Sequence, residues 1–178
     1  MIQGERTNHR RLAYTNKNSI MRLIVLDGPI SRTALAKRVG LSLPSVMSIT
    51  EDLIGRGLIQ TVGKGKSNGG KPPELLSVVP NSEFYMGVDI GRGTIRLVFL
   101  NAAQKVIYGT RVDTGTVEPA ESFVERLCEL IQRSLLEADI DTTRLVGVGV
   151  AMPGLIERDT GHVLFSPDFG WNDIPLQN

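Results

Sequence analysis

The stretch that most constrains the fold of this chain runs from Gly28 to Pro73. Its first half holds two short segments with apolar residues at helical spacing. Its second half holds an apolar segment and a loop rich in Gly and Lys, and another apolar segment follows directly after Pro73. Two short helices joined by a tight turn and followed by a small β-hairpin form a winged helix-turn-helix, a module that binds duplex DNA. The sequence therefore predicts a winged helix-turn-helix domain over residues 1–80.

Turn and capping residues set the limits of the two short helices. Ser31 is suited to cap a helix over residues 32–39, and Gly40 is suited to end it in a left-handed conformation. Ser42 is suited to cap the second helix, whose first turn tolerates Pro44. The start of this second helix is the part that enters the major groove in such a module.

The residues before this stretch predict one more helix and a basic terminus. The helix is expected to begin near Thr15 or Asn18, either of which can cap it, and to end at about Asp27. Residues 1–14 are polar and basic. We interpret them either as a frayed terminus or as an arm that follows the phosphate backbone or enters a minor groove.

The hairpin supplies the remaining contacts expected on DNA. Strands are predicted over residues 58–62 and 74–79, and the loop between them, GKGKSNGGKPP, carries three lysines that can contact phosphates. The alternatives are a packed helical unit without a role on DNA and a loop that is merely solvated. The DNA-binding candidates of the whole domain are Arg32, Ser42, Leu43, Ser45, Met47, Ser48, Lys64, Lys66 and Lys71.

Charge is divided unevenly along the chain. Residues 1–80 hold twelve Lys or Arg against five Asp or Glu, an excess of seven positive charges, although the whole chain has a formal net charge of only +1. The remaining residues hold eight bases against fourteen acids. This division favours nucleic-acid binding by the first part alone.

The rest of the chain, residues 84–178, predicts a domain of a different kind. We expect a helix over residues 119–138 and a buried strand over residues 145–151, LVGVGVA, in which the glycines allow another backbone to pack closely. Residues 155–157 and 162–165 are expected to pair as a hairpin, and residues 166–176 to be loop-like. Three strands of an antiparallel meander are predicted to precede the helix, over residues 84–90, 95–100 and 106–112.

A meander, a helix and a Gly-rich strand are how an actin/hexokinase-like (ribonuclease H-like) ATPase lobe begins. The predicted fold class is therefore mixed, α+β and α/β: a winged helix-turn-helix followed by a partial lobe of this type. In such lobes a turn of the form Asp-x-Gly holds phosphate, because small residues let backbone N–H groups approach the anion. Here the turn is degenerate and comprises Asp89, Gly91, Gly93 and Thr94. The candidates for a ligand cleft are Pro153, Gly154 and Asn172.

Four motifs in this order resemble the ROK family, in its repressor branch of NagC/XylR/Mlc-like regulators. They are GPISRTALAKRVGLSLPSVMSITEDLIGRGLI, GGKPPELLSV, GVDIGRGTIRLVFL and VGVGVAMPGLIERDTGHVLFSPDFGWNDIPL, and they cover nearly all of the chain. The resemblance implies a DNA-binding winged helix coupled to a sugar-kinase-like domain, in which a sugar or a partner protein alters operator binding.

Two departures from the family pattern argue against catalysis. Kinases of the family have Asp-Ile-Gly-Gly-Thr at the turn, whereas Arg92 stands here at the second Gly, Gly93 at the Thr, and Thr94 follows one place late. The family's later Asn-Asp motif with the catalytic base, its sugar-binding glutamate and histidine and its Cys-rich zinc loop lie outside this sequence. We therefore predict no enzyme activity, no catalytic residue, no cofactor and no metal site. Sugar binding would need the missing C-terminal part.

The sequence thus predicts a DNA-binding transcriptional regulator, a repressor of carbohydrate-use genes that acts as a homodimer on double-stranded DNA, with a possible sugar effector. The alternatives are a ROK-type sugar kinase and an interaction protein that does not bind DNA. No apolar run is long enough to span a bilayer, so the expected location is the cytoplasm. The strand ending at Ala151 is expected to expose an edge and an apolar face, either because the chain is a fragment of a longer regulator or because it self-associates.

Overall fold

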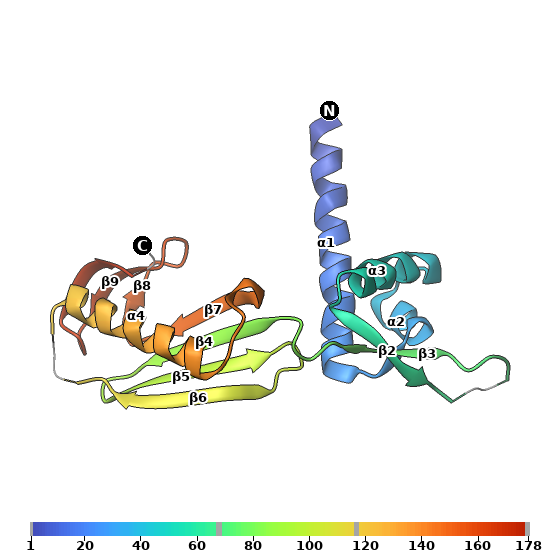
Figure 1. The fold of residues 1–178 in the computed structure, drawn as a ribbon. Helices are drawn as coiled ribbons and strands as arrows, with labels where there is room; N and C mark the ends of the chain where they lie inside the picture. The colour runs from blue at the N-terminus through green and yellow to red at the C-terminus, as the bar shows by residue number, and fades with distance from the viewer. Residues whose placement is uncertain (1, 67–68, 116–117, 177–178) are drawn as a thin grey trace. The chain divides into compact units, whose positions relative to one another are not determined.

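The computed structural model describes residues 2–66, 69–115 and 118–176, with side chains from Arg11 onward. The chain divides into two compact units, which Figure 1 shows as ribbons. Unit 1 comprises Met1–Ser82 with Ala102–Gln104, and unit 2 comprises Glu83–Asn101 with Lys105–Asn178. Each unit is described below by itself.

Unit 1 has three helices and a small antiparallel sheet. Its buried core gathers Ile20 and Ile24 of the first helix, Leu35 of the second, and Val46 and Leu53 of the third. The sheet has the order β1-β3-β2, and β1 is a short strand that the sequence pattern did not predict. The elements are α1 (Ile2–Asp27), β1 (Ile30–Ser31), α2 (Arg32–Val39), α3 (Leu43–Gly55), β2 (Ile59–Lys64) and β3 (Glu74–Val78).

The capping residues at the turn between α2 and α3 behave as predicted. The Ser31 hydroxyl accepts a hydrogen bond from the backbone N–H of Ala34 at 3.2 Å, and Gly40 ends α2 with a left-handed φ of 69°. The Ser42 hydroxyl accepts from the N–H of Ser45 at 3.3 Å at the start of α3. These local bonds fix where each helix begins and ends, and so fix which residues α3 exposes.

The predicted start of α1 is wrong, because the helix begins at Ile2 and not near Thr15 or Asn18. The Thr15 hydroxyl donates to the carbonyl of Arg11 one turn earlier, and Ser19 donates in the same way to Thr15. Residues that resemble caps in the sequence are therefore interior positions whose hydroxyls bond back along the helix. Within residues 1–14, which were predicted as a frayed terminus or a basic arm, the side chains of residues 1–10 lie outside the described ones.

Unit 2 is a four-stranded sheet with one face covered by a helix. The sheet has the order β6-β5-β4-β7, in which β4, β5 and β6 form the predicted antiparallel meander and β7 runs parallel to β4. Figure 1 shows α4 lying along one face of this sheet. The elements are β4 (Phe84–Ile90), β5 (Thr94–Asn101), β6 (Val106–Asp113), α4 (Ala120–Glu137), the 3₁₀ turn η1 (Thr142–Arg144), β7 (Leu145–Ala151), β8 (Leu155–Ile156), β9 (His162–Ser166) and β10 (Trp171–Pro175).

The Gly-rich strand β7 is not the buried strand that its sequence predicts. It forms the edge of the sheet, and its side chains Val146, Val148 and Val150 are 53%, 54% and 48% exposed. The edge and apolar face that the strand ending at Ala151 is expected to expose are therefore present in unit 2. Leu155 is also exposed, at 62%.

The last described segment is a strand, where the sequence pattern predicts a loop. Strand β10 pairs antiparallel with β9, which also pairs with β8, so the predicted hairpin becomes a three-stranded sheet. Trp171 begins β10 and is only 4% exposed, since its ring packs edge-on against Phe123 of α4 at 5.1 Å between centroids. This aromatic contact ties the end of the described chain to the core of unit 2.

Candidate nucleic-acid interface

Helix α3 turns one face to the core of unit 1 and leaves its first two turns open to solvent. Val46, Thr50 and Leu53 are buried against the core. On the other faces the predicted base-reading residues Leu43, Ser45, Met47 and Ser48 are all exposed, as is Ser42 at the cap. All five candidates are therefore accessible at the start of α3, the part of such a helix that enters the major groove.

Two of the serine candidates are bonded to each other. The Ser42 and Ser45 hydroxyl oxygens lie 2.8 Å apart, and the Ser42 hydroxyl also accepts a hydrogen bond from the Ser45 N–H. Their first role is therefore to hold the start of α3. Among the described residues, Ser48 makes no side-chain hydrogen bond, so its hydroxyl is the one free to bond a base edge.

Arg32, a predicted DNA contact, is instead bonded inside unit 1. Its Nε donates to the Thr50 hydroxyl of α3 at 3.0 Å, and its Nη1 donates to the Glu74 carboxylate of β3 at 3.1 Å. The Arg32 side chain is only 20% exposed, whereas Glu74 is 54% exposed. Arg32 thus links α2 to α3 and to β3, contacts that the sequence alone did not reveal.

A second ion pair joins α1 to α3. The Lys17 ammonium donates to the Asp52 carboxylate. This hydrogen bond, together with the positive charges of Lys17 and Arg56, holds the pKa of Asp52 below its ordinary value of 3.8. The pair fixes the far part of α3 against α1 and leaves the first turns of α3 unaffected.

The three lysines of the hairpin are exposed to solvent. Lys64 ends β2, while Lys66 and Lys71 lie in the connection to β3, and all three are exposed. Within the described ranges none of them forms an ion pair. Flexible ammonium groups that have no protein partner are free to meet phosphates, because a phosphate contact by lysine needs no fixed geometry.

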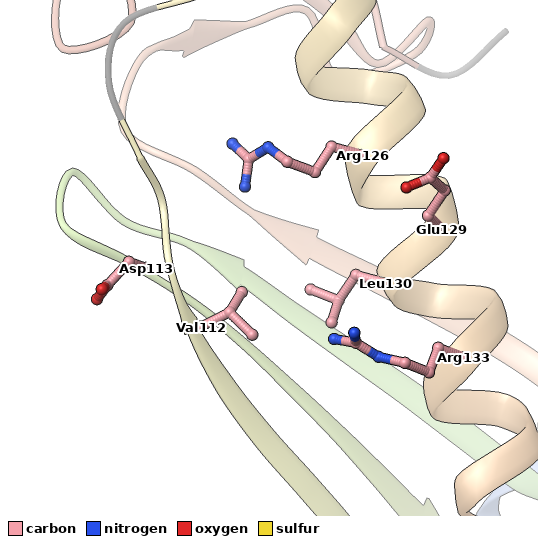
Figure 2. Close-up of a pocket in the computed structure, with 6 residues that line it drawn as sticks. All are labelled: Val112, Asp113, Arg126, Glu129, Leu130 and Arg133. Atoms are coloured by element: carbon pink, nitrogen blue, oxygen red, sulfur yellow. The ribbon is translucent and has the colours of Figure 1, made fainter.

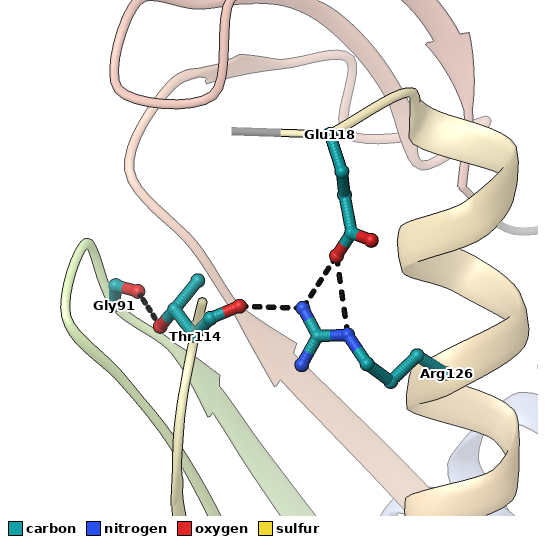
Figure 3. Close-up of polar contacts among 4 residues, drawn as sticks. All are labelled: Gly91, Thr114, Glu118 and Arg126. Atoms are coloured by element: carbon teal, nitrogen blue, oxygen red, sulfur yellow. Dashed lines mark hydrogen bonds and ion pairs between the residues drawn. The ribbon is translucent and has the colours of Figure 1, made fainter. Parts of the chain in front are cut away.

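In unit 2 the turn predicted to be a degenerate phosphate turn is closed by its own hydrogen bonds. The Gly91 N–H donates to the Thr94 carbonyl at 2.9 Å, so this amide does not point to a ligand. Figure 3 shows the rest of the network: the Thr114 hydroxyl donates to the Gly91 carbonyl at 2.6 Å, and Arg126 of α4 donates to the Thr114 carbonyl and to Glu118.

The other residues of that turn are either bonded within the protein or exposed to solvent. Gly93 accepts a backbone hydrogen bond from Thr114 at 3.3 Å, and Arg92 is exposed. Asp89, the acid of the motif, is 55% exposed and lies 3.5 Å from Arg96 on the neighbouring strand. The turn is therefore a tight structural connection with an arginine at its tip.

A cavity that the sequence did not predict lies between the end of β6 and α4. It has a volume of about 390 Å³ and is lined by Val112, Asp113, Arg126, Glu129, Leu130 and Arg133, which Figure 2 draws as sticks. Two guanidinium groups and two carboxylates line it, so it carries no excess charge that would select an ion. Arg126 is also already bonded to Glu118 and Thr114.

The three ligand-cleft candidates come together at strand β9. The Ser166 hydroxyl donates to the Pro153 carbonyl at 2.7 Å, and Asn172 of β10 pairs opposite Phe165. Gly154 has a φ of 149°, and a Cβ there would lie 2.7 Å from the Phe165 carbonyl. Close packing of backbones explains Gly154. The ligand role of Pro153, Gly154 and Asn172 stays a prediction.

Within the described parts of the chain, no helix is both long and apolar enough to cross a lipid bilayer.

Comparison with known proteins gives matches over both units. Residues 85–178 match the ROK family, and residues 15–60 match a winged helix-turn-helix DNA-binding family. The chain is 32% identical over 171 residues to the xylose repressor of Caldicellulosiruptor bescii, covering 96% of this chain and 43% of that protein. It is 30% identical over 162 residues to the DNA-binding transcriptional dual regulator NagC of Escherichia coli K12, covering 85% of this chain and 37% of NagC.

A solved structure has the same fold. The crystal structure of a ROK family transcriptional regulator, described as a homolog of the E. coli Mlc protein, superposes with a TM-score of 0.73 at 24% identity. The superposition covers 93% of this chain and 42% of that one. The chain thus spans less than half the length of the regulators that it resembles over nearly all of its own length.

Proposed function

The chain belongs to the ROK family, and from this premise we propose that it is a transcriptional regulator that binds double-stranded DNA through residues 1–80 and represses carbohydrate-use genes. The observation that carries the proposal is the open start of α3 together with a hairpin whose three lysines are exposed and form no ion pair with the residues that the structure describes. We further propose that a sugar regulates DNA binding, because the similar proteins include a xylose repressor. The sugar response is assigned to the domain that begins at residue 84.

The proposed contacts divide into base readers and phosphate contacts. Leu43, Met47 and Ser48 are assigned to base edges, because they are exposed on α3 and their side chains are not needed for its cap. Lys64, Lys66 and Lys71 are assigned to phosphates. Ser42, Ser45 and Arg32 are proposed to act on DNA binding indirectly, by holding α3 in position.

A sugar kinase is the alternative that the family allows, and we do not favour it. Kinase turns need backbone N–H groups directed at phosphate, whereas the Gly91 N–H is bonded to Thr94 and Arg92 occupies the tip. The described relatives that span nearly the whole chain are repressors and regulators. We therefore propose a regulator without catalysis, active as a homodimer in the cytoplasm where its DNA lies.

Fluorescence anisotropy of the 178-residue chain on DNA from its own promoter region tests the proposal, with random duplex as the control and a series of salt concentrations. Binding that is tight, selective and steeply salt-dependent is expected, because phosphate contacts release counterions. Equal affinity for both duplexes, or no binding at low salt, would contradict the proposal. Sedimentation of the same samples tests the homodimer.

A further inference from the structure

The accessible start of α3 has an unusual chemistry for a helix that reads bases. From Ser42 to Ser48 its sequence is SLPSVMS, without Arg, Lys, Asn or Gln. Leu43 and Met47, one turn apart on the same side of the helix, are 40% and 42% exposed. Side chains that form paired hydrogen bonds with guanine or adenine are thus absent from this part of α3.

Two of the three serine hydroxyls in this segment already form hydrogen bonds within the protein. The Ser42 and Ser45 hydroxyls are 2.8 Å apart and bonded to each other, and Ser42 also caps the helix. Of the serines in this segment, Ser48 alone has no side-chain bond among the described residues. The surface that this segment offers to a major groove is therefore made of the exposed apolar side chains of Leu43, Pro44 and Met47 and the Ser48 hydroxyl.

Thymine carries the one apolar group on the major-groove edges of the four bases, its C5-methyl group. Leu43 or Met47 against a guanine or adenine edge would leave buried acceptors without partners, which is unfavourable. The same side chains against thymine methyl groups bury apolar surface on both sides. We infer that Leu43 and Met47 read thymine methyl groups, so that the half-site under α3 is selected by its thymines. This inference rests on the proposed function.

Charge favours DNA over a protein as the occupant of this surface. Unit 1 contributes an excess of seven positive charges through residue 80, and the hairpin lysines Lys64, Lys66 and Lys71 are exposed without ion pairs among the described residues. An apolar patch on a basic unit is complementary to a polyanion whose groove holds methyl groups. A neutral apolar partner would leave those lysines unused.

Uracil replacement tests the inference, because deoxyuridine pairs with adenine as thymidine does and lacks only the methyl group. The probe is a duplex selected by the 178-residue chain from a random-sequence library, resynthesised with deoxyuridine at each thymidine in turn. We expect binding to weaken about fourfold at one or two positions in each half-site, the effect of one buried methyl-sized group. The replacement changes only the DNA, so folding of the protein is not at issue.

Protein variants assign the effect to a residue. In Met47→Ala or Leu43→Ala the penalty for uracil should vanish at one position, because the methyl group no longer has a partner. The matched control is Leu136→Ala, which truncates a leucine of α4 that is 82% exposed and should keep every penalty. Circular dichroism of each variant verifies that it is folded.

The outcomes separate this inference from the function on which it rests. If a sequence is selected but every uracil is tolerated within about twofold, or if both α3 variants retain the full penalties, methyl reading is wrong and DNA binding stands. If the library yields no preferred sequence, the proposed function itself is contradicted.

Discussion

Removing the hairpin lysines gives the sharpest test of how this chain holds DNA. Lys64, Lys66 and Lys71 are exposed and have no ion-pair partner among the described residues. If each neutralises one phosphate, changing all three to Ala should make the negative slope of log affinity against log salt about 2.7 less steep, at about 0.9 for each contact. Raising salt about fourfold, from about 50 to about 200 mM, should then weaken the unchanged chain about 40-fold more than the variant.

The assay is anisotropy on one labelled duplex at five or more salt concentrations, repeated on a random duplex. The loss should be nearly the same on both duplexes, because phosphates carry no sequence information. The matched control changes Lys105, Arg111 and Arg158 to Ala, which removes the same three charges from exposed positions of unit 2. An unchanged slope in the lysine variant, or an equal change in the control, would refute phosphate contacts by the hairpin.

Three further predictions concern stability. Arg32→Ala should lower the free energy of unfolding of unit 1 by about 1–3 kcal/mol, because a part-buried hydrogen bond to α3 is lost, while Arg38→Ala, exposed on the same helix, should change it by less than about 1 kcal/mol in denaturant titrations. Asp52→Asn should lower the melting temperature near pH 7. Because the pKa of Asp52 in the folded chain lies below 3.8, the ionised carboxylate stabilises the fold above that pH. The difference in melting temperature between the two chains, followed by thermal unfolding over a pH series, should shrink as the pH falls below 3.8. Phe123→Ala should destabilise unit 2 by about 3–5 kcal/mol, measured by the fluorescence of Trp171, the one tryptophan of the chain, and an unshifted transition would contradict their contact.

Local chemistry made the turn between α2 and α3 predictable from the sequence. Ser31, Gly40 and Ser42 act within three or four residues of themselves, so the pattern already contains the partners of each bond. The start of α1 was missed for a related reason. Thr15 has the chemistry of a cap, but the same hydroxyl bonds equally well to the carbonyl of Arg11 inside a helix, and the sequence does not distinguish the two geometries.

Contacts between distant segments were beyond the reach of the sequence pattern. Arg32 stays a predicted DNA-binding residue, but its hydrogen bonds to Thr50 and Glu74 could not be predicted, because these partners lie on other elements. Strand β10 was missed because its stability depends on Trp171 packing against Phe123 of α4. The exposure of β7 follows from its place at the sheet edge, which no local pattern of Val and Gly specifies.

Affinity and sequence preference are assigned here to different elements of unit 1, and this separation has a measurable consequence. The hairpin supplies charge without hydrogen-bond geometry, and α3 supplies shape and methyl contacts without charge in its first two turns. Changes to Lys64, Lys66 or Lys71 should therefore alter the salt slope and leave the ratio of selected to random DNA nearly constant. Changes to Leu43 or Met47 should alter the ratio and leave the slope. If the variants of either element changed both the salt slope and the ratio of selected to random affinity in proportion, the hairpin and α3 would act as a single contact. The assignment of base reading to α3 alone would then lose its basis.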